Sequence, residues 1–97
     1  MAPARIEVDH VDGNSFRVTV REGGRSSTHV VTVEPEYARG LAGDAVSRED
    51  LVRGSFEFLL EREPASSILR RFDLDVIGRY FPDYIETIRR QMAPGGL

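Results

Sequence analysis

Apolar and polar side chains alternate along the first third of the chain, as they do in β-strands with one buried face. Three successive runs carry apolar residues at alternate positions, namely Ile6 and Val8, then Phe16, Val18 and Val20, then Val31 and Val33. Glycine-containing segments, Asp12-Gly13-Asn14 and Glu22-Gly23-Gly24-Arg25, separate the runs. Glycine tolerates the positive φ of tight turns, so the sequence predicts a three-stranded antiparallel meander over residues 1–34.

From Pro35 onward the apolar spacing becomes that of helices. Pro35 suits the first turn of a helix because its missing N–H has no partner there anyway, and Gly43 suits a left-handed cap. Ser47 then offers its hydroxyl to the first-turn N–H groups of a second helix. We expect that helix to end at about Glu63, because the following Pro64 disfavours helical geometry in the residue before it.

Residues 64–82 indicate shorter helical pieces. Ser66 or Ser67 can cap a turn that carries Phe72, and Asp73 can cap another that carries residues 74–80. These turns are expected to add apolar side chains to the same buried layer.

A last amphipathic helix is expected from Asp83 to Met92, followed by a frayed tail over residues 94–97. Residues 35–93 would thus form a helical layer. The apolar face of the meander needs a cover, and the helices present a matching apolar stripe. The sequence therefore predicts a single domain over residues 1–97 of the α+β class, a three-stranded antiparallel meander covered on one face by C-terminal helices.

Composition narrows the function classes. The 97 residues carry 13 basic and 16 acidic side chains, a net charge of −3, and every basic residue is arginine. Arginine suits interfaces and phosphate sites, although a compositional bias is the simpler explanation of an all-arginine set. The chain has no cysteine, and its longest aliphatic or aromatic run is Phe58-Leu59-Leu60. We therefore expect a cytoplasmic protein with no disulfide, no secretory signal and no membrane span.

Residues that could carry catalysis are few. The two histidines, His10 and His29, are expected at strand ends without chemistry, since neither has an acidic neighbour placed to orient it. An enzyme built on them would need a buried pocket that holds both. Ser26-Ser27 and Ser66-Ser67 lack the motif that surrounds a serine nucleophile. The sequence thus predicts no enzyme, no cofactor and no metal site.

One stretch resembles a family of DNA-binding regulators. From Thr28 to Leu60 the chain has a strand, a Pro35-Glu36 helix start, a glycine-containing turn and a Ser47-x-x-x-Leu51 helix that ends in Phe-Leu. This arrangement is similar to the ribbon-helix-helix proteins, whose paired strands enter the major groove as a dimer. The resemblance implies base contacts by Thr28, Val30 and Thr32 and phosphate contacts by Ser47 and Arg48.

The whole chain also resembles small bacterial proteins of unknown function. The similarity rests on the segment FEFLLEREP, residues 56–64, and on the segment SILRRFDLDVIGRYFP, residues 67–82. It implies a bacterial or archaeal cytoplasmic origin and no particular activity.

Aromatic and arginine side chains gather near the C-terminus, and these residue types are enriched at the centres of protein interfaces. The candidate partner-binding residues are Arg70, Arg71, Arg79, Tyr80, Phe81 and Tyr84. Core positions for Phe81 and Tyr84 with solvated arginines are the alternative. We expect a small non-catalytic interaction domain whose partner is another protein or a second copy. The alternative is a DNA-binding or antitoxin-like regulator, which the net charge of −3 disfavours.

Overall fold

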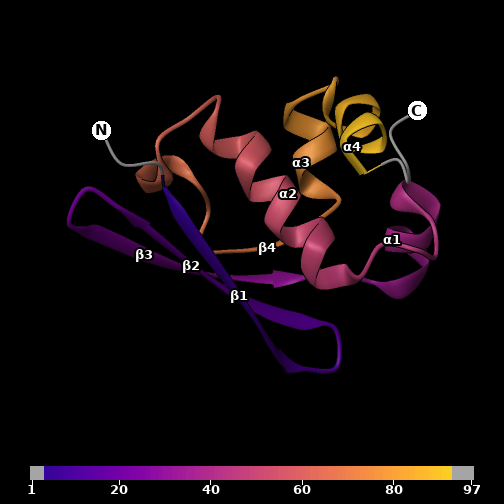
Figure 1. Cartoon of the computed structure of the whole chain (residues 1–97), viewed down its shortest axis with the longest axis horizontal. Helices are drawn as coiled ribbons and strands as arrows, with labels where there is room; N and C mark the ends of the chain where they lie inside the picture. Colours follow the sequence, from indigo (N-terminus) through magenta and orange to yellow (C-terminus); the bar gives the residue numbers. More distant parts are fainter. Residues whose placement is uncertain (1–3, 93–97) are drawn as a thin grey trace.

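Strands come first and helices follow, in two main layers. The computed structural model describes residues 4–92, so the tail expected at 94–97 lies outside the described residues. The strands are β1 (Arg5–Asp12), β2 (Ser15–Glu22), β3 (Arg25–Thr32) and β4 (Arg71–Asp73). The helices are α1 (Pro35–Ala42), α2 (Arg48–Leu60), α3 (Val76–Tyr80) and α4 (Tyr84–Met92), with a 3₁₀ turn, η1 (Ala65–Ser67), after α2. The helices cover one face of the sheet, which confirms the predicted α+β class (Figure 1).

The antiparallel meander forms as the alternation predicted. Val8 on β1, Val18 on β2 and His29 on β3 stand in one cross-strand row. The turn between β2 and β3 places Gly23 and Gly24 at φ 54° and 83°. Two consecutive residues of positive φ twist in the same sense as the flanking strands, so this turn fixes the β2–β3 register.

A fourth strand, β4, lies where the sequence predicted a helical turn. It runs parallel to β3, with Val31 opposite Phe72. The Val30 N–H donates to the Arg70 carbonyl at 2.7 Å, and the Leu74 N–H donates to the Thr32 carbonyl at 2.9 Å. Phe72 is buried between two exposed neighbours, the pattern of a strand. Three residues are too few to establish a period, which is why the helical interpretation was wrong here.

Helix α2 lies between the sheet and α4. Leu51, Val52 and Phe56 are fully buried in the core, as is Phe58. Figure 1 shows α2 crossing one face of the sheet, with α3 and α4 together on its other side. The core therefore has a sheet-facing half and an α4-facing half, and α2 contributes to both.

The helix ends follow their local chemistry. Ser47 caps α2 as predicted, accepting from the Asp50 N–H at 3.0 Å. The helix ends at Leu60 rather than at Glu63, where the chain tightens and the Leu59 carbonyl also accepts an i→i−3 bond from the Arg62 N–H at 2.9 Å. Asp73 lies in β4 and caps nothing, and α3 instead begins after Asp75. Within residues 4–92, no helix combines the length and apolarity needed to cross a bilayer.

Candidate functional site

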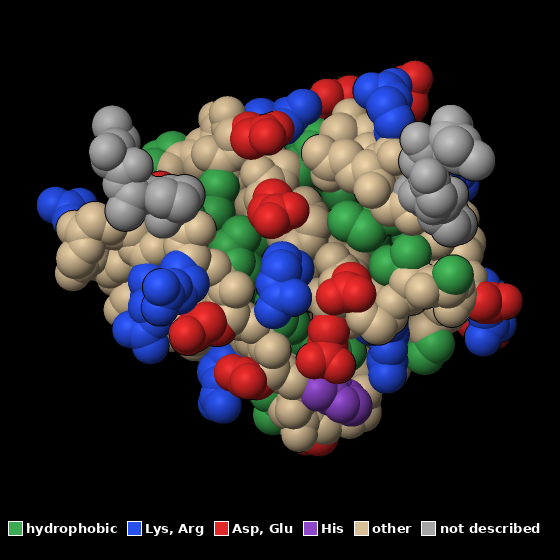
Figure 2. Space-filling model, in the orientation of Figure 1, with side chains coloured by type: hydrophobic (Ala, Val, Ile, Leu, Met, Phe, Trp, Pro, Cys, Tyr) green, Lys and Arg blue, Asp and Glu red, His purple; other side chains and the backbone are tan. Residues whose placement is uncertain are grey.

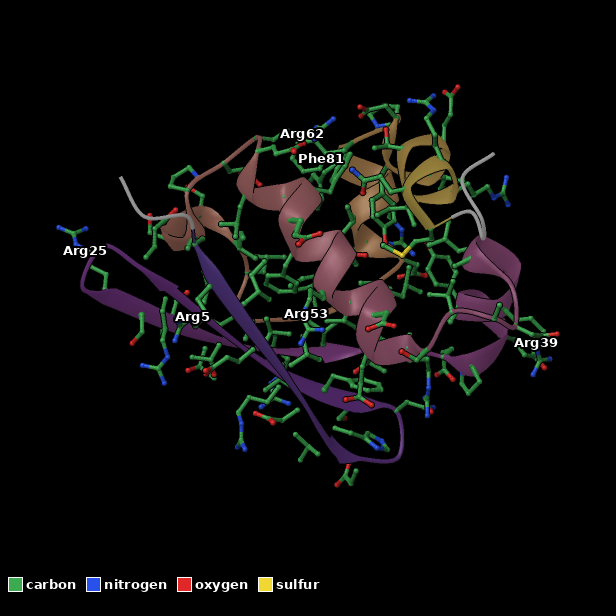
Figure 3. All side chains as sticks on the ribbon, in the orientation of Figure 1. Arg5, Arg25, Arg39, Arg53, Arg62 and Phe81 are labelled. Carbon is green, nitrogen blue, oxygen red and sulfur yellow. The ribbon has the colours of Figure 1, made fainter. Side chains whose placement is uncertain are left out.

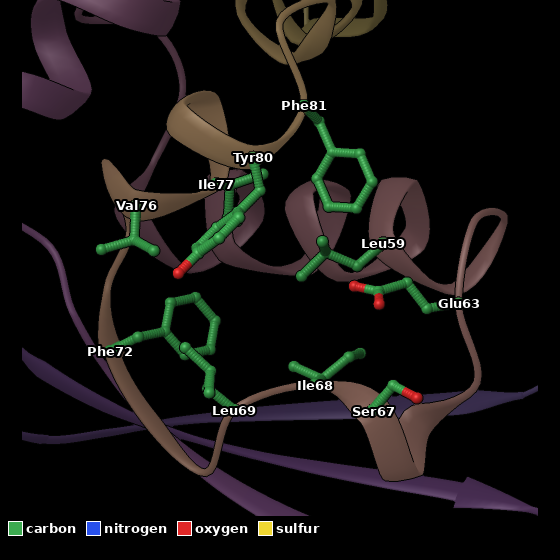
Figure 4. A pocket seen from close by; sticks show the side chains of 10 residues that line it. All are labelled: Leu59, Glu63, Ser67, Ile68, Leu69, Phe72, Val76, Ile77, Tyr80 and Phe81. Carbon is green, nitrogen blue, oxygen red and sulfur yellow. The ribbon is translucent and has the colours of Figure 1, made fainter.

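An apolar groove opens between the end of α2, the segment after η1, and α3. Its volume is about 340 Å³. Four buried side chains form its floor, namely Leu59, Ile68, Phe72 and Ile77. Figure 4 shows Tyr80 and Phe81 descending into the groove from the end of α3. A concave apolar surface of this size falls at the lower end of the range of ligand pockets.

The rim of the groove carries large apolar side chains in contact with solvent. Leu69 is 53% exposed and Tyr80 is 70% exposed. The backbone at Leu69 is fixed, because its carbonyl accepts from the ring of buried His29 at 2.7 Å. Alternate residues of this extended segment point to opposite sides, so Ile68 enters the core while Leu69 stays outside. The exposed apolar surface is thus held in place rather than free to collapse inward.

One acidic side chain lines the groove. Glu63 is half-buried, and its carboxylate faces the groove in Figure 4. Among residues 4–92, no cationic nitrogen lies within 4 Å of it. The neighbouring Arg62 is engaged elsewhere, with Asp83 at 2.8 Å and with the Phe58 ring. The groove therefore offers an apolar floor beside one uncompensated negative charge.

The structure separates the six residues predicted to bind a partner. Tyr80 and Phe81 line the groove, and Arg79 is exposed beside them with Asp75 at 3.8 Å. Arg70 lines a different cavity, on the far side of Ile68. Arg71 stands opposite Val30 on the sheet face that the helices leave open.

The sixth candidate, Tyr84, lies in the core and has no exposed surface. Its hydroxyl donates to Ser55 Oγ at 2.7 Å, and Ser55 Oγ donates to the Leu51 carbonyl at 2.7 Å. Burial raises the pKa of the Tyr84 phenol well above its ordinary value, and the Ser55 hydrogen bond offsets that only in part. A side chain without exposed surface cannot contact a partner, so the prediction of Tyr84 as a partner-binding residue was wrong.

In the structure, the residues that the ribbon-helix-helix resemblance assigns to DNA contacts are not arranged as in that family. Thr28, Val30 and Thr32 lie on the open sheet face, but β3 is bonded to β2 on one edge and to β4 on the other. The paired ribbon of that family needs a free edge on this strand, and β4 occupies that edge at residues 30–32.

The two predicted phosphate contacts are engaged within the domain. Ser47 caps α2. Arg48 donates to Asn14 Oδ1 at 2.8 Å and to the Val33 carbonyl at 3.0 Å, with its guanidinium over the Phe16 ring. Figure 2 shows arginine and acidic side chains interspersed over the helical face, without a single-sign patch. No described feature favours the DNA-binding alternative.

The two histidines differ sharply in environment. His10 is exposed, stacks on Phe16 with ring centroids 4.7 Å apart, and bonds through Nε2 to the Gly13 carbonyl. His29 is 1% exposed and sits within β3 rather than at its end, which corrects the prediction. The cavity that His29 lines does not include His10.

His29 has partners that the sequence interpretation missed. Its Nδ1 lies 2.7 Å from the Leu69 carbonyl, and its Nε2 lies 2.9 Å from Ser27 Oγ. Both side chains line a cavity of about 280 Å³ under η1. The Ser-x-His spacing on a strand was the available signal, since residues two apart share a face. The carbonyl comes from 40 residues away and only folding supplies it.

Comparison with protein-family models, with curated proteins and with solved structures found no match to this chain. The resemblance to small bacterial proteins therefore stays a prediction. Among residues 4–92, no cluster of three or more histidine, aspartate or glutamate side chains is arranged to hold a metal ion.

Proposed function

We propose that this protein is a small interaction module whose groove binds a segment of another protein. The observation that carries the proposal is the apolar groove with Leu69 and Tyr80 exposed at its rim. Large apolar side chains held in solvent beside a concave floor are typical of surfaces that a partner covers. Tyrosine at the edge of such a pocket is also among the residue types that contribute most to binding.

The chemistry of the groove selects the kind of segment. The floor suits one apolar anchor side chain, and burial of a leucine or phenylalanine contributes roughly 1.5–3 kcal/mol. Glu63 faces the same space without a cation, so a lysine or arginine next to the anchor would be favoured. We therefore propose a partner segment in which an apolar anchor is adjacent to a basic residue.

Selection from a phage library of random peptides on the immobilised protein tests this proposal. We expect enriched peptides to share an apolar residue next to lysine or arginine. In fluorescence anisotropy, Leu69→Ser and Tyr80→Ser should each weaken the binding of a synthetic enriched peptide at least about tenfold. The matched control is Val11→Ser, because Val11 is 51% exposed on β1, outside the lining of the groove.

The charge is tested separately. Glu63→Gln should weaken binding of the same peptide several-fold, whereas Glu61→Gln, two residues earlier and paired with Arg62 at 3.5 Å, should not. The proposal is overturned if no peptide is enriched, or if enriched peptides bind the Leu69→Ser and Tyr80→Ser variants unchanged. Self-association that these substitutions abolish, without peptide binding, would assign the groove to a second copy of the chain instead.

A further inference from the structure

A second cavity under η1 contains an arrangement that the interaction proposal does not use. His29 Nδ1 lies 2.7 Å from the Leu69 carbonyl oxygen, which can only accept a hydrogen bond. The proton of a neutral ring therefore lies on Nδ1, and the lone pair of Nε2 faces Ser27 Oγ at 2.9 Å. The serine hydroxyl consequently donates to the histidine.

This arrangement is that of a nucleophile, a base and a group that orients the base. The β-strand places Ser27 and His29 on one face, and the parallel pairing of β4 with β3 brings in the Leu69 carbonyl. Phe56 packs beside the His29 ring with centroids 5.3 Å apart, which restricts its rotation. His29 is almost fully buried while Ser27 is only partly buried, so the hydroxyl remains reachable from the cavity.

We propose that Ser27 and His29 form a hydrolytic pair that cleaves small carboxylic esters in this cavity. The cavity of about 280 Å³ sets the size of the substrate. This site is separate from the groove of the interaction proposal, since the two share only the buried side chain of Ile68.

The reaction follows from the geometry. Ser27 Oγ attacks the ester carbonyl carbon as its proton passes to His29 Nε2. The tetrahedral intermediate expels the alcohol, which takes that proton from Nε2, and leaves an acyl ester on Ser27. Water then attacks the acyl carbon and gives a proton to Nε2, which returns it to the departing Ser27 oxygen. One water is consumed, and an acid and an alcohol are released.

Arg70 supplies hydrogen-bond donors for the negative charge that develops on the carbonyl oxygen. It follows Leu69 directly and lines the same cavity, whereas Arg25, which also contributes to the lining, projects from the β2–β3 turn (Figure 3). Among residues 4–92, no carboxylate oxygen lies within 4 Å of the Arg70 guanidinium nitrogens. Glu22 also lines the cavity, but it is not paired with Arg70 within that distance, so the Arg70 donors remain available for an oxyanion.

Two probes test the pair. A fluorophosphonate should phosphonylate Ser27, releasing fluoride, with the adduct located by peptide mass spectrometry. The intact chain should also hydrolyse p-nitrophenyl acetate, and Ser27→Ala should lower that rate at least about a hundredfold, because it removes the nucleophile whose proton His29 accepts, a step that typically contributes about 10²–10⁴-fold. The matched control is Thr28→Ala, because Thr28 follows Ser27 directly, also loses a hydroxyl, and lies on the open sheet face outside the lining of the cavity.

Further variants separate catalysis from packing. Arg70→Gln should slow ester hydrolysis, whereas Arg71→Gln, on the open sheet face, should not. Because His29 is buried, His29→Gln can fail to fold, so the Ser27 adduct and the Ser27→Ala rate decide the question. The proposal is overturned if folded wild-type protein carries no adduct on Ser27, or if Ser27→Ala hydrolyses the ester at the wild-type rate. Neither result bears on peptide binding at Leu69 and Tyr80.

Discussion

Arg62 shows how one side chain joins distant parts of the fold. Its guanidinium lies 3.6 Å from the centroid of the Phe58 ring and donates to the Phe58 carbonyl at 3.1 Å. It also donates to Asp83 at 2.8 Å, just before α4. The side chain is 29% exposed, so these contacts are partly shielded from water. Arg62 therefore satisfies the Phe58 carbonyl near the end of α2 and also fixes the approach of α4.

We predict that Arg62→Ala lowers the free energy of unfolding by about 1–2 kcal/mol in urea titrations, since it removes a charge-assisted hydrogen bond and a cation–π contact. Arg53→Ala is the control. Its ion pair with Asp50 is longer, at 3.8 Å, and lies on an exposed helix surface, where such pairs contribute less than about 0.5 kcal/mol. Equal losses in the two variants would refute the role assigned to Arg62.

Tyr84 is a second residue whose role can be measured, through the pH dependence of stability. Burial raises its pKa in the folded protein above the ordinary tyrosine value of 10.0. Below that value both folded and unfolded chains keep the proton, and the full stability is present. Above it the unfolded chain ionises first, so stability falls as the pH rises towards the folded pKa. Tyr37, whose pKa burial also raises, adds in the same direction.

We predict that the free energy of unfolding falls between pH 10 and pH 11 by up to about 1.4 kcal/mol through Tyr84, with a smaller contribution from the half-buried Tyr37. Tyr84→Phe should reduce that slope, and it leaves Ser55 bonded to the Leu51 carbonyl. A Tyr84→Phe profile that runs parallel to wild type would contradict this assignment.

At the scale of elements, the short strand β4 changes the role of β3. A bare three-stranded meander would leave the outer amides of β3 open to water and to other chains. The bonds from Val30 N–H to Arg70 and from Leu74 N–H to Thr32 close this edge. The same strand carries Phe72 to the groove floor and follows the Leu69 carbonyl that holds His29. Both candidate sites thus depend on β4.

Native-state hydrogen exchange checks this closure. We predict that the Val30 and Leu74 amides exchange at least about tenfold more slowly than the turn amides of Gly23 and Gly24, because bonded amides exchange only after local opening. The outward amides of β1 serve as the reference for a free edge, since β1 pairs with β2 alone. Exchange at Val30 as fast as at Gly23 would show that β4 does not stay docked.

Across the whole molecule, α2 connects two packing interfaces. Phe56 lies 5.3 Å from the His29 ring and 6.0 Å from the Phe72 ring, on the sheet side. Phe58 lies 5.3 Å from Tyr84 and 5.8 Å from Phe81, on the side of α3 and α4. Because one helix serves both, we expect the sheet and the helices to unfold together.

We predict that Phe58→Ala lowers the free energy of unfolding by about 3–5 kcal/mol, the usual cost of removing a fully buried phenylalanine. Phe81→Ala should cost less, because Phe81 is only half-buried at the groove. Circular dichroism and tyrosine fluorescence should report one coincident transition in both variants. Separate transitions for the two probes would show that the α4 side unfolds independently of the sheet.

Local patterns determined most of the architecture. The alternation through Phe16, Val18 and Val20 and the glycine turn at Gly23 gave the meander. Ser47 predicted the start of α2, because a capping side chain bonds to a backbone N–H in the first turn of its own helix. These features need only neighbouring residues, so the sequence shows them directly. Tyr80 and Tyr84 were both candidate partner contacts, with a core position for Tyr84 as the alternative, and the structure leaves Tyr80 exposed and buries Tyr84.

Only the tertiary structure decided where distant segments meet. β4 has three residues and no period of its own, and it becomes a strand because β3 offers an unpaired edge. The groove floor combines Leu59 of α2 with side chains that lie 9 to 18 residues later in the chain, from Ile68 to Ile77. His29 gains its carbonyl partner from Leu69 in the same way. Such contacts depend on which surfaces remain unsatisfied after the local elements form, and that is a property of the packed chain rather than of any short stretch of sequence.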